Sequence, residues 1–127
     1  MTTHLAGVDI VLPGRVLRGG TLTISDGRIA AVEPGSAGDG DLAGHLVVPG
    51  FIDVHVHGVL GVDTLQSDDA VARIAAVLPR YGVTAFCPTS VACTPSGLRS
   101  LLGQVRQARE RPAPHAARVL PAHLESN

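Results

Sequence analysis

The sequence predicts an α/β fold in which a small antiparallel sheet precedes the opening βα units of a parallel (β/α) barrel. Three observations support this fold class: alternating apolar and polar runs before Pro49, strands alternating with amphipathic helices after it, and polar side chains at the strands' carboxyl ends. A complete barrel needs roughly 250 residues, whereas this chain has 127. We therefore expect residues 1–48 to form the small sheet and residues 49–127 to form the first three βα units of an incomplete barrel.

The composition is that of a folded protein without a strong charge bias. Ten basic and eleven acidic residues leave a net charge of −1, so we expect neither a nucleic-acid partner nor a charged membrane surface. All basic residues are Arg, and the absence of Lys excludes a phosphate-binding P-loop and a Schiff-base lysine within these residues. The sequence has no secretory signal and no apolar run near the length of a membrane span, so we expect a cytoplasmic protein.

Residues 1–48 contain short alternating runs that are typical of antiparallel strands. These runs are Val8–Leu12, Leu22–Ile24 and Ile29–Val32. Asp26–Gly27 lies between two of them and predicts a hairpin turn. The Gly-rich stretch 35–40 has the composition of a loop, and Leu46–Val48 begins another extended segment. A sheet this small needs a partner surface to be stable.

From Pro49 onward, predicted strands alternate with predicted helices. The strands are Phe51–Val56, Val83–Cys87 and Arg118–Leu124. Ser67 is the predicted N-cap of the first helix, which Tyr81–Gly82 ends, and Thr94 before Pro95 is the predicted N-cap of the second. One apolar stripe per helix supports the helical period: Val71, Ile74, Ala75 and Leu78 in the first, and Leu98, Leu101, Leu102 and Val105 in the second. This order predicts right-handed βαβ units.

Two histidines at the end of the first parallel strand are the strongest candidates for chemistry. Side chains alternate along a strand, so His55 and His57 project to the same side and can bind one divalent cation. The same count places His123 and Glu125 together on the third strand. A carboxylate at the inward end of an apolar strand would be buried without a partner, and a cation would remove that cost. Structural histidines and an exposed Glu125 are the competing interpretations.

Other polar residues receive weaker predictions. Asp53, one pleat deeper on the first strand, is expected to be hydrogen-bonded and structural. Thr89 and Ser90 end the second strand and could line a pocket, while His123 is a candidate substrate contact. The remaining histidines, His4, His45 and His115, are expected to be solvated. The two cysteines, Cys87 and Cys93, are expected to be buried.

Several segments resemble one enzyme superfamily. Val47–Gly58, reading VVPGFIDVHVHG, is similar to the first barrel strand of the amidohydrolase superfamily of metal-dependent hydrolases. Tyr81–Thr89 (YGVTAFCPT), the terminal His-Leu-Glu and the early segment GGTLTISDGRIAAVEPG narrow the resemblance to the N-acetylglucosamine-6-phosphate deacetylase family. Ser126 and Asn127 stand where this family usually has Gly-Pro, which affects the loop after the third strand.

This resemblance implies that residues 1–48 are half of a small β-sandwich and that residues 49–127 begin the TIM barrel of a longer enzyme. The implied reaction is hydrolysis of N-acetylglucosamine 6-phosphate to glucosamine 6-phosphate and acetate, in amino-sugar catabolism. It implies Glu125, His55 and His57 as ligands of one or two divalent ions, zinc or iron. The general acid–base aspartate is expected beyond residue 127, and the whole enzyme is expected to be a homodimer. We expect the 127 residues alone to be inactive and poorly soluble.

Two alternatives remain open. One is another amidohydrolase, such as a cyclic amidase or a nucleobase deaminase, several of which bridge two metals with a carboxylated Lys on the fourth strand. A Glu on the third strand argues against these enzymes. The other alternative is a non-catalytic metal-binding module derived from the same barrel.

Overall fold

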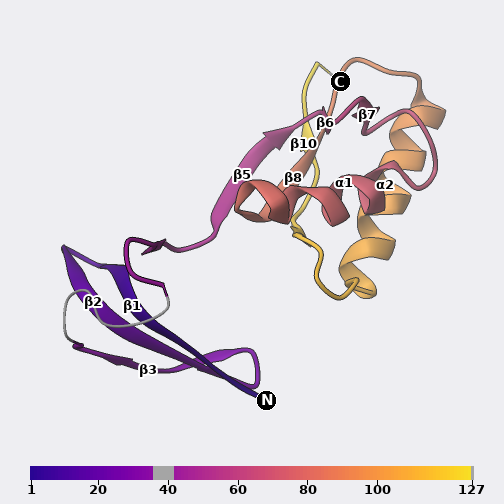
Figure 1. Cartoon of the computed structure of the whole chain (residues 1–127). Helices are drawn as coiled ribbons and strands as arrows, with labels where there is room; N and C mark the ends of the chain where they lie inside the picture. The colour runs from indigo at the N-terminus through magenta and orange to yellow at the C-terminus, as the bar shows by residue number, and fades with distance from the viewer. Residues whose placement is uncertain (36–41, 127) are drawn as a thin grey trace. The chain divides into compact units, whose positions relative to one another are not determined.

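The computed structural model describes residues 1–35 and 42–126, and the chain divides into two compact units, Met1–Pro49 and Gly50–Asn127. The division falls one residue after the predicted boundary. Each unit has its own sheet (Figure 1) and its own cluster of buried apolar side chains. The two units are therefore described separately.

The first unit is a four-stranded sheet with strand order β3-β2-β1-β4. Its strands are β1 (Thr2–Leu12), β2 (Arg15–Ser25), β3 (Arg28–Glu33) and β4 (Leu46–Val47). β2 pairs antiparallel with β1 and β3, and β4 pairs parallel with β1. Its core consists of Val8, Ile10 and Leu22, which are 1%, 4% and 5% exposed. The predicted antiparallel strands are confirmed.

Two tight turns connect these strands. The predicted turn is confirmed, since Asp26 and Gly27 have φ values of 50° and 73°, as a type I′ hairpin turn requires. A second turn at Pro13–Gly14, between β1 and β2, was not predicted. The predicted Gly-rich loop lies outside the described residues except for Gly35.

Asp9 on β1 is held by two donors. The Gly19 N–H donates to Oδ1 at 3.0 Å and the Arg18 guanidinium donates to Oδ2, and these hydrogen bonds lower the pKa of Asp9 below its usual value. A carboxyl group with a depressed pKa in the folded state adds stability above its unfolded pKa. That stability is lost as the pH falls through the folded pKa.

We therefore expect the stability of the first unit to decrease between about pH 5 and the lower pKa of folded Asp9. Asp9→Asn should lack this part of the decrease, because an amide does not titrate in this range. Urea midpoints followed by far-UV circular dichroism at several pH values would measure the effect. Glu33→Gln, which alters an exposed carboxyl of the same sheet, is the matched control. Equal pH profiles for Asp9→Asn and the wild type would contradict the assignment.

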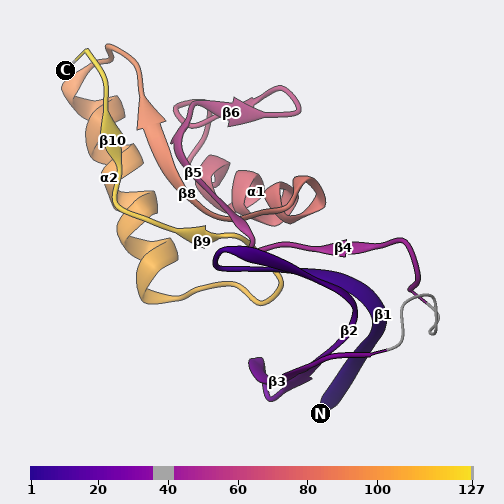
Figure 2. The same ribbon diagram turned by 90° about the vertical axis from the view of Figure 1, so that its left-hand side faces the viewer.

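The second unit is a parallel sheet with helices on one face. β8 (Val83–Ser90) pairs in parallel with β5 (Phe51–Val56), with β9 (Arg118–Val119) and with β10 (His123–Leu124). The helices α1 (Ala70–Val77) and α2 (Pro95–Glu110) cover the same face of this sheet (Figures 1 and 2). A hairpin of β6 (Gly58–Val59) and β7 (Val62–Asp63) follows β5, and the 3₁₀-helix η1 (Leu78–Tyr81) follows α1. The predicted alternation of strands and helices is confirmed.

Apolar stripes of both helices form the core against the sheet. All four predicted residues of the first stripe are buried: Val71, Ile74, Ala75 and Leu78. In α2, Leu101 and Val105 are buried as predicted. Leu102 is 42% exposed, so its predicted place in the buried stripe is wrong. Gln104 occupies an inward position instead and is 9% exposed. Within the described residues, no helix is long and apolar enough to cross a membrane.

The start of α1 differs from the prediction, because its N-cap is Asp69 rather than Ser67. The Ser67 hydroxyl donates to the Asp69 carboxylate at 2.6 Å, and the Asp69 N-cap makes no side-chain cap hydrogen bond. Gln104 of α2 takes this role: its Oε1 accepts the Val71 N–H at 3.1 Å, and its Nε2 donates to the Ser67 carbonyl at 2.9 Å. A side chain from the second helix therefore satisfies the first turn of the first helix.

The third predicted strand is interrupted. β9 and β10 are two residues each, and Leu120–Ala122 between them is not a strand. Pro121 has no N–H to donate to the ladder, which explains the break. Val119 in β9 and Ala122 after the break both contact the core, so side chains do not alternate through the break.

Gly82 and Gly103 provide a matched pair of positions for the same substitution. Gly82 follows η1 with φ 78°, and a Cβ there would lie 3.3 Å from the Phe51 ring, whereas a Cβ at Gly103 in α2 would meet no atom within 4 Å. We expect Gly82→Ala to lower the free energy of unfolding by about 1–2 kcal/mol. Gly103→Ala should raise it by about 0.5–1 kcal/mol, because Ala is the better helix former. Urea unfolding of both variants would test this, and equal signs would contradict it.

Candidate metal centre

Three side chains with metal-binding atoms meet at the carboxyl end of the parallel sheet. His55 is near the end of β5, His57 follows it, and Glu125 follows β10. Glu125 Oε2 lies 3.0 Å from His55 Nε2 and 3.1 Å from His57 Nε2, and the two Nε2 atoms are 3.0 Å apart. Among the described residues, these three form a group whose ligand atoms all lie within 4.8 Å of one another.

The chemistry of this triangle fits a cation. An imidazole Nε2 carries either one proton or one lone pair, so it is only a donor or only an acceptor. No assignment of protons therefore turns all three short contacts into separate, well-directed hydrogen bonds. A divalent cation accepts the lone pairs of two imidazoles and one carboxylate together, and zinc takes this set of ligands. His55, His57 and Glu125 would hold such an ion.

His55, His57 and Glu125, called the metal triad below, are half-exposed: the exposed fractions of their side chains are 45%, 36% and 44%. The expectation that Glu125 would be a buried carboxylate is therefore wrong, because its side chain is 44% exposed. Its argument assumed that the third strand is covered on its inner side. The metal assignment depends on the short distances between the donor atoms and not on burial.

His123 and Asp53 contact the backbone near the histidines. His123 Nδ1 is 3.0 Å from the Val54 carbonyl oxygen, and its ring meets His55 edge-on with centroids 4.7 Å apart. Asp53 Oδ1 accepts the His55 N–H at 3.0 Å. Both contacts restrict the orientation of His55, and substrate binding by His123 stays a prediction.

The remaining predicted polar residues lie apart from the triad or behind it. Thr89 and Ser90 are 0% exposed, so they do not line an open pocket. Their hydroxyl groups accept the backbone N–H groups of Val56 and Glu125, respectively. The other three histidines are exposed and both cysteines are half-buried: His4, His45, His115, Cys87 and Cys93. Sequence reasoning missed the roles of the two buried hydroxyl groups, although two successive hydroxyl residues at the end of an apolar strand were a usable signal.

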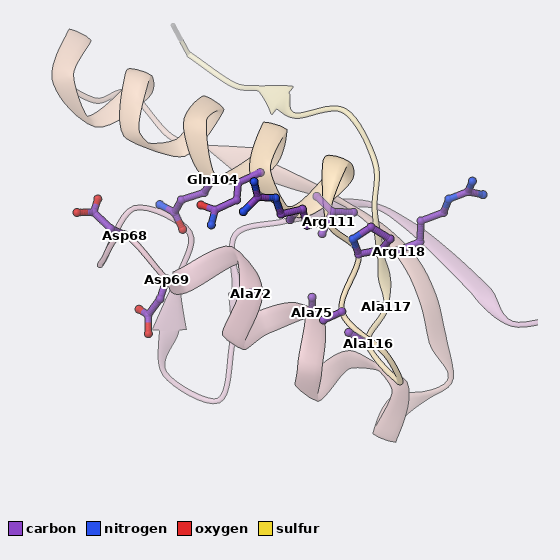
Figure 3. Close-up of a pocket in the computed structure, with 14 residues that line it drawn as sticks. Asp68, Asp69, Ala72, Ala75, Gln104, Arg111, Ala116, Ala117 and Arg118 are labelled. Carbon is purple, nitrogen blue, oxygen red and sulfur yellow. The ribbon is translucent and has the colours of Figure 1, made fainter.

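A cavity of about 300 Å³ lies elsewhere, between α1, α2 and the segment that precedes β9. Figure 3 shows Asp68 and Asp69 at one end of it and Arg118 at the other, with alanines between them. Neither the two histidines nor Glu125 lines this cavity. The candidate chemistry is therefore at the strand ends and not in this cavity.

Comparisons with known proteins give a consistent result. No family model matches the chain. It is 37% identical to the N-acetylglucosamine-6-phosphate deacetylase of Rattus norvegicus over 87% of this chain and 31% of the relative. It is 36% identical to the N-acetylgalactosamine-6-phosphate deacetylase of Escherichia coli O157:H7 over 82% of this chain and 28% of the relative.

A solved structure extends this relationship to the fold. The crystal structure of N-acetylglucosamine-6-phosphate deacetylase from Thermotoga maritima matches with a TM-score of 0.80 and 28% identity, over 98% of this chain and 32% of that chain. The chain thus spans about a third of the length of the relatives it matches. By sequence and by fold, the chain is a homologue of N-acetylglucosamine-6-phosphate deacetylases, enzymes with the amidohydrolase fold, over about a third of their length.

Proposed function

We propose that the chain supplies the first metal-binding part of a deacetylase that hydrolyses N-acetylglucosamine 6-phosphate to glucosamine 6-phosphate and acetate. The observation that carries this proposal is the 3.0–3.1 Å triangle of His55, His57 and Glu125, in a chain whose relatives are named as deacetylases of amino-sugar phosphates. In this proposal residues 1–48 are half of a β-sandwich and residues 49–127 are the first three βα units of a TIM barrel.

Within this proposal the triad binds a divalent ion, zinc or iron. Such an ion polarises an amide carbonyl and lowers the pKa of a water molecule. The residues of the chain would fix the position of the ion: β5 and the residue that follows it provide two imidazoles, and the segment after β10 provides a carboxylate. The general acid–base aspartate would come from other parts of the enzyme, so the 127 residues alone are expected to be inactive.

Two epimeric substrates have to be weighed, N-acetylglucosamine 6-phosphate and N-acetylgalactosamine 6-phosphate. The relative from Escherichia coli is named for N-acetylgalactosamine 6-phosphate and the one from Rattus norvegicus for N-acetylglucosamine 6-phosphate, at nearly equal identity. We propose the gluco epimer, the one named for the mammalian relative and for the structure from Thermotoga maritima. A homodimer in the cytoplasm, where phosphorylated sugars are retained by their charge, completes the proposal.

A chimeric enzyme would test this function. The 127 residues would replace the matching third of the Thermotoga maritima deacetylase, since the match covers 98% of this chain and 32% of that chain. We expect the zinc-loaded chimera to release free amine from N-acetylglucosamine 6-phosphate, and the His57→Ala chimera to be inactive. Failure of a folded, zinc-loaded chimera to hydrolyse either epimer would overturn the proposal.

The number of ions is a separate prediction. Because both histidines share Glu125 Oε2 with short contacts, we expect His55 and His57 to hold an ion in addition to any site formed by the rest of the enzyme. Metal analysis of the chimera should then give two ions per subunit, and His55→Ala should lose one of them. A single ion that is kept in His55→Ala would contradict a second position.

A further inference from the structure

The central strand β8 ends in two successive buried hydroxyl residues that reach in opposite directions. Thr89 and Ser90 are both 0% exposed. Thr89 Oγ1 accepts the Val56 N–H at 2.9 Å, toward β5, while Ser90 Oγ accepts the Glu125 N–H at 3.2 Å, beyond β10. Each hydroxyl thus binds a backbone segment that carries part of the metal triad.

The Thr89 hydroxyl accepts a backbone N–H at a point where the ladder between β5 and β8 is irregular. The register between β5 and β8 shifts between Asp53 and Val56, and the Cα partner of Val56 is Pro88. At this irregular position the Thr89 hydroxyl accepts the Val56 N–H, and it donates its own proton to the Cys87 carbonyl at 3.1 Å. It is therefore oriented as an acceptor toward Val56.

The location of this bond gives it a consequence for the metal centre. Val56 lies between His55 and His57, so a hydrogen bond to its N–H holds the short backbone segment that carries both imidazoles. Glu125 provides the third candidate ligand atom, and its backbone N–H is held by the hydroxyl of Ser90, the residue after Thr89 in β8. The distance between the histidine pair and the carboxylate is thus set through two adjacent side chains of β8.

We propose that Thr89 and Ser90 are positioning residues that set the spacing of the three metal ligands, an inference that rests on the proposed metal centre. Partners that orient metal ligands change metal affinity by about 10- to 100-fold when they are removed. Thr89→Val keeps the shape of the side chain and removes the hydroxyl, and Ser90→Ala does the same at the next position. Neither change alters a ligand atom.

The chain offers a matched control. Thr64 is 1% exposed, and its hydroxyl donates to the Thr89 carbonyl at 2.7 Å. Its bond to the histidine segment comes from its backbone N–H, which donates to the His57 carbonyl at 2.8 Å and is kept when the side chain is changed. Thr64→Val therefore removes an equally buried hydroxyl from the same region. Thr89→Ser, which keeps the hydroxyl, is the rescue variant.

Zinc affinity of the full 127-residue chain, measured by competition with a chromophoric chelator, tests the inference. We expect Thr89→Val and Ser90→Ala to bind zinc about 10- to 100-fold more weakly than the wild type, with a changed visible spectrum of bound cobalt. Thr64→Val and Thr89→Ser should stay within about threefold. Circular dichroism would verify that each variant is folded. If Thr89→Val does not fold, the zinc affinity of Ser90→Ala compared with that of Thr89→Ser still tests whether a buried hydroxyl of β8 positions the ligands.

The outcomes separate the two proposals. If the wild type binds zinc and both hydroxyl variants bind it as tightly as Thr64→Val, the positioning role is wrong and the metal centre stands. If the wild type itself binds neither zinc nor cobalt, the metal centre is wrong, and the positioning role with it.

Discussion

Glu125→Gln is expected to weaken zinc binding by at least about a hundredfold, since even residues that only orient a ligand change affinity by 10- to 100-fold. Glu125 Oε2 is the atom that both imidazoles share, at 3.0 and 3.1 Å. The substitution keeps the length and shape of the side chain. It replaces a charged oxygen donor with an amide, a much weaker ligand for a divalent cation. Isothermal titration with zinc at constant pH would measure the loss.

Glu110→Gln provides the control for charge. Glu110 is an exposed carboxylate at the end of α2, away from the strand ends, and the substitution changes the net charge by the same amount. We expect its zinc affinity to stay within about twofold of the wild type, because exposed charges that are distant from a site are screened by salt. Equal affinities for Glu125→Gln and Glu110→Gln would exclude Glu125 as a ligand.

Local features of the fold could be predicted from the sequence. The helical period of Val71, Ile74 and Leu78 identified the buried face of α1, and Thr94 caps α2 by accepting the Gly97 N–H at 3.2 Å, as its place before Pro95 predicts. These features depend on residues a few positions apart. A single chain segment contains all the information they need.

Features that depend on distant segments could not be predicted in the same way. Ser67 has the sequence of an N-cap, but Gln104 satisfies the first turn of α1 from 33 residues away. Nothing in the sequence near Ser67 indicates that competition. The same limit applies to Leu102, whose exposure depends on what covers that side of α2.

The candidate site combines both kinds of information. Strand alternation predicts that His55 and His57 share a side, and likewise His123 and Glu125. The distance between the pairs depends instead on the register of β5 and β10 on β8, a relation between residues 68 positions apart. Alternation predicts the side on which each candidate ligand lies, whereas the distance between the pairs depends on the contacts that β8 makes with both segments.

Phe86→Ala is expected to cost about 3–5 kcal/mol of the free energy of unfolding of the second unit, the largest stability effect that we predict. Phe86 lies in β8 and is 0% exposed, packed in the core with Ile74 of α1 and Leu101 of α2. Its removal leaves a cavity that the sheet and both helices border. Urea unfolding followed by Tyr81 fluorescence would measure the loss, because the single tyrosine of the chain lies in this unit and there is no tryptophan.

Phe51→Ala is the matched control, since it removes the same side chain from a position that is 59% exposed. We expect it to cost less than about 1 kcal/mol, because most of its apolar surface is in water in both states. β8 pairs with both β5 and β10, so loosening it at Phe86 also loosens the link between the histidines and Glu125. Zinc should therefore raise the urea midpoint of Phe51→Ala as much as that of the wild type, and that of Phe86→Ala by less. Comparable losses of stability in the two variants would show that Phe86 is not the centre of this core.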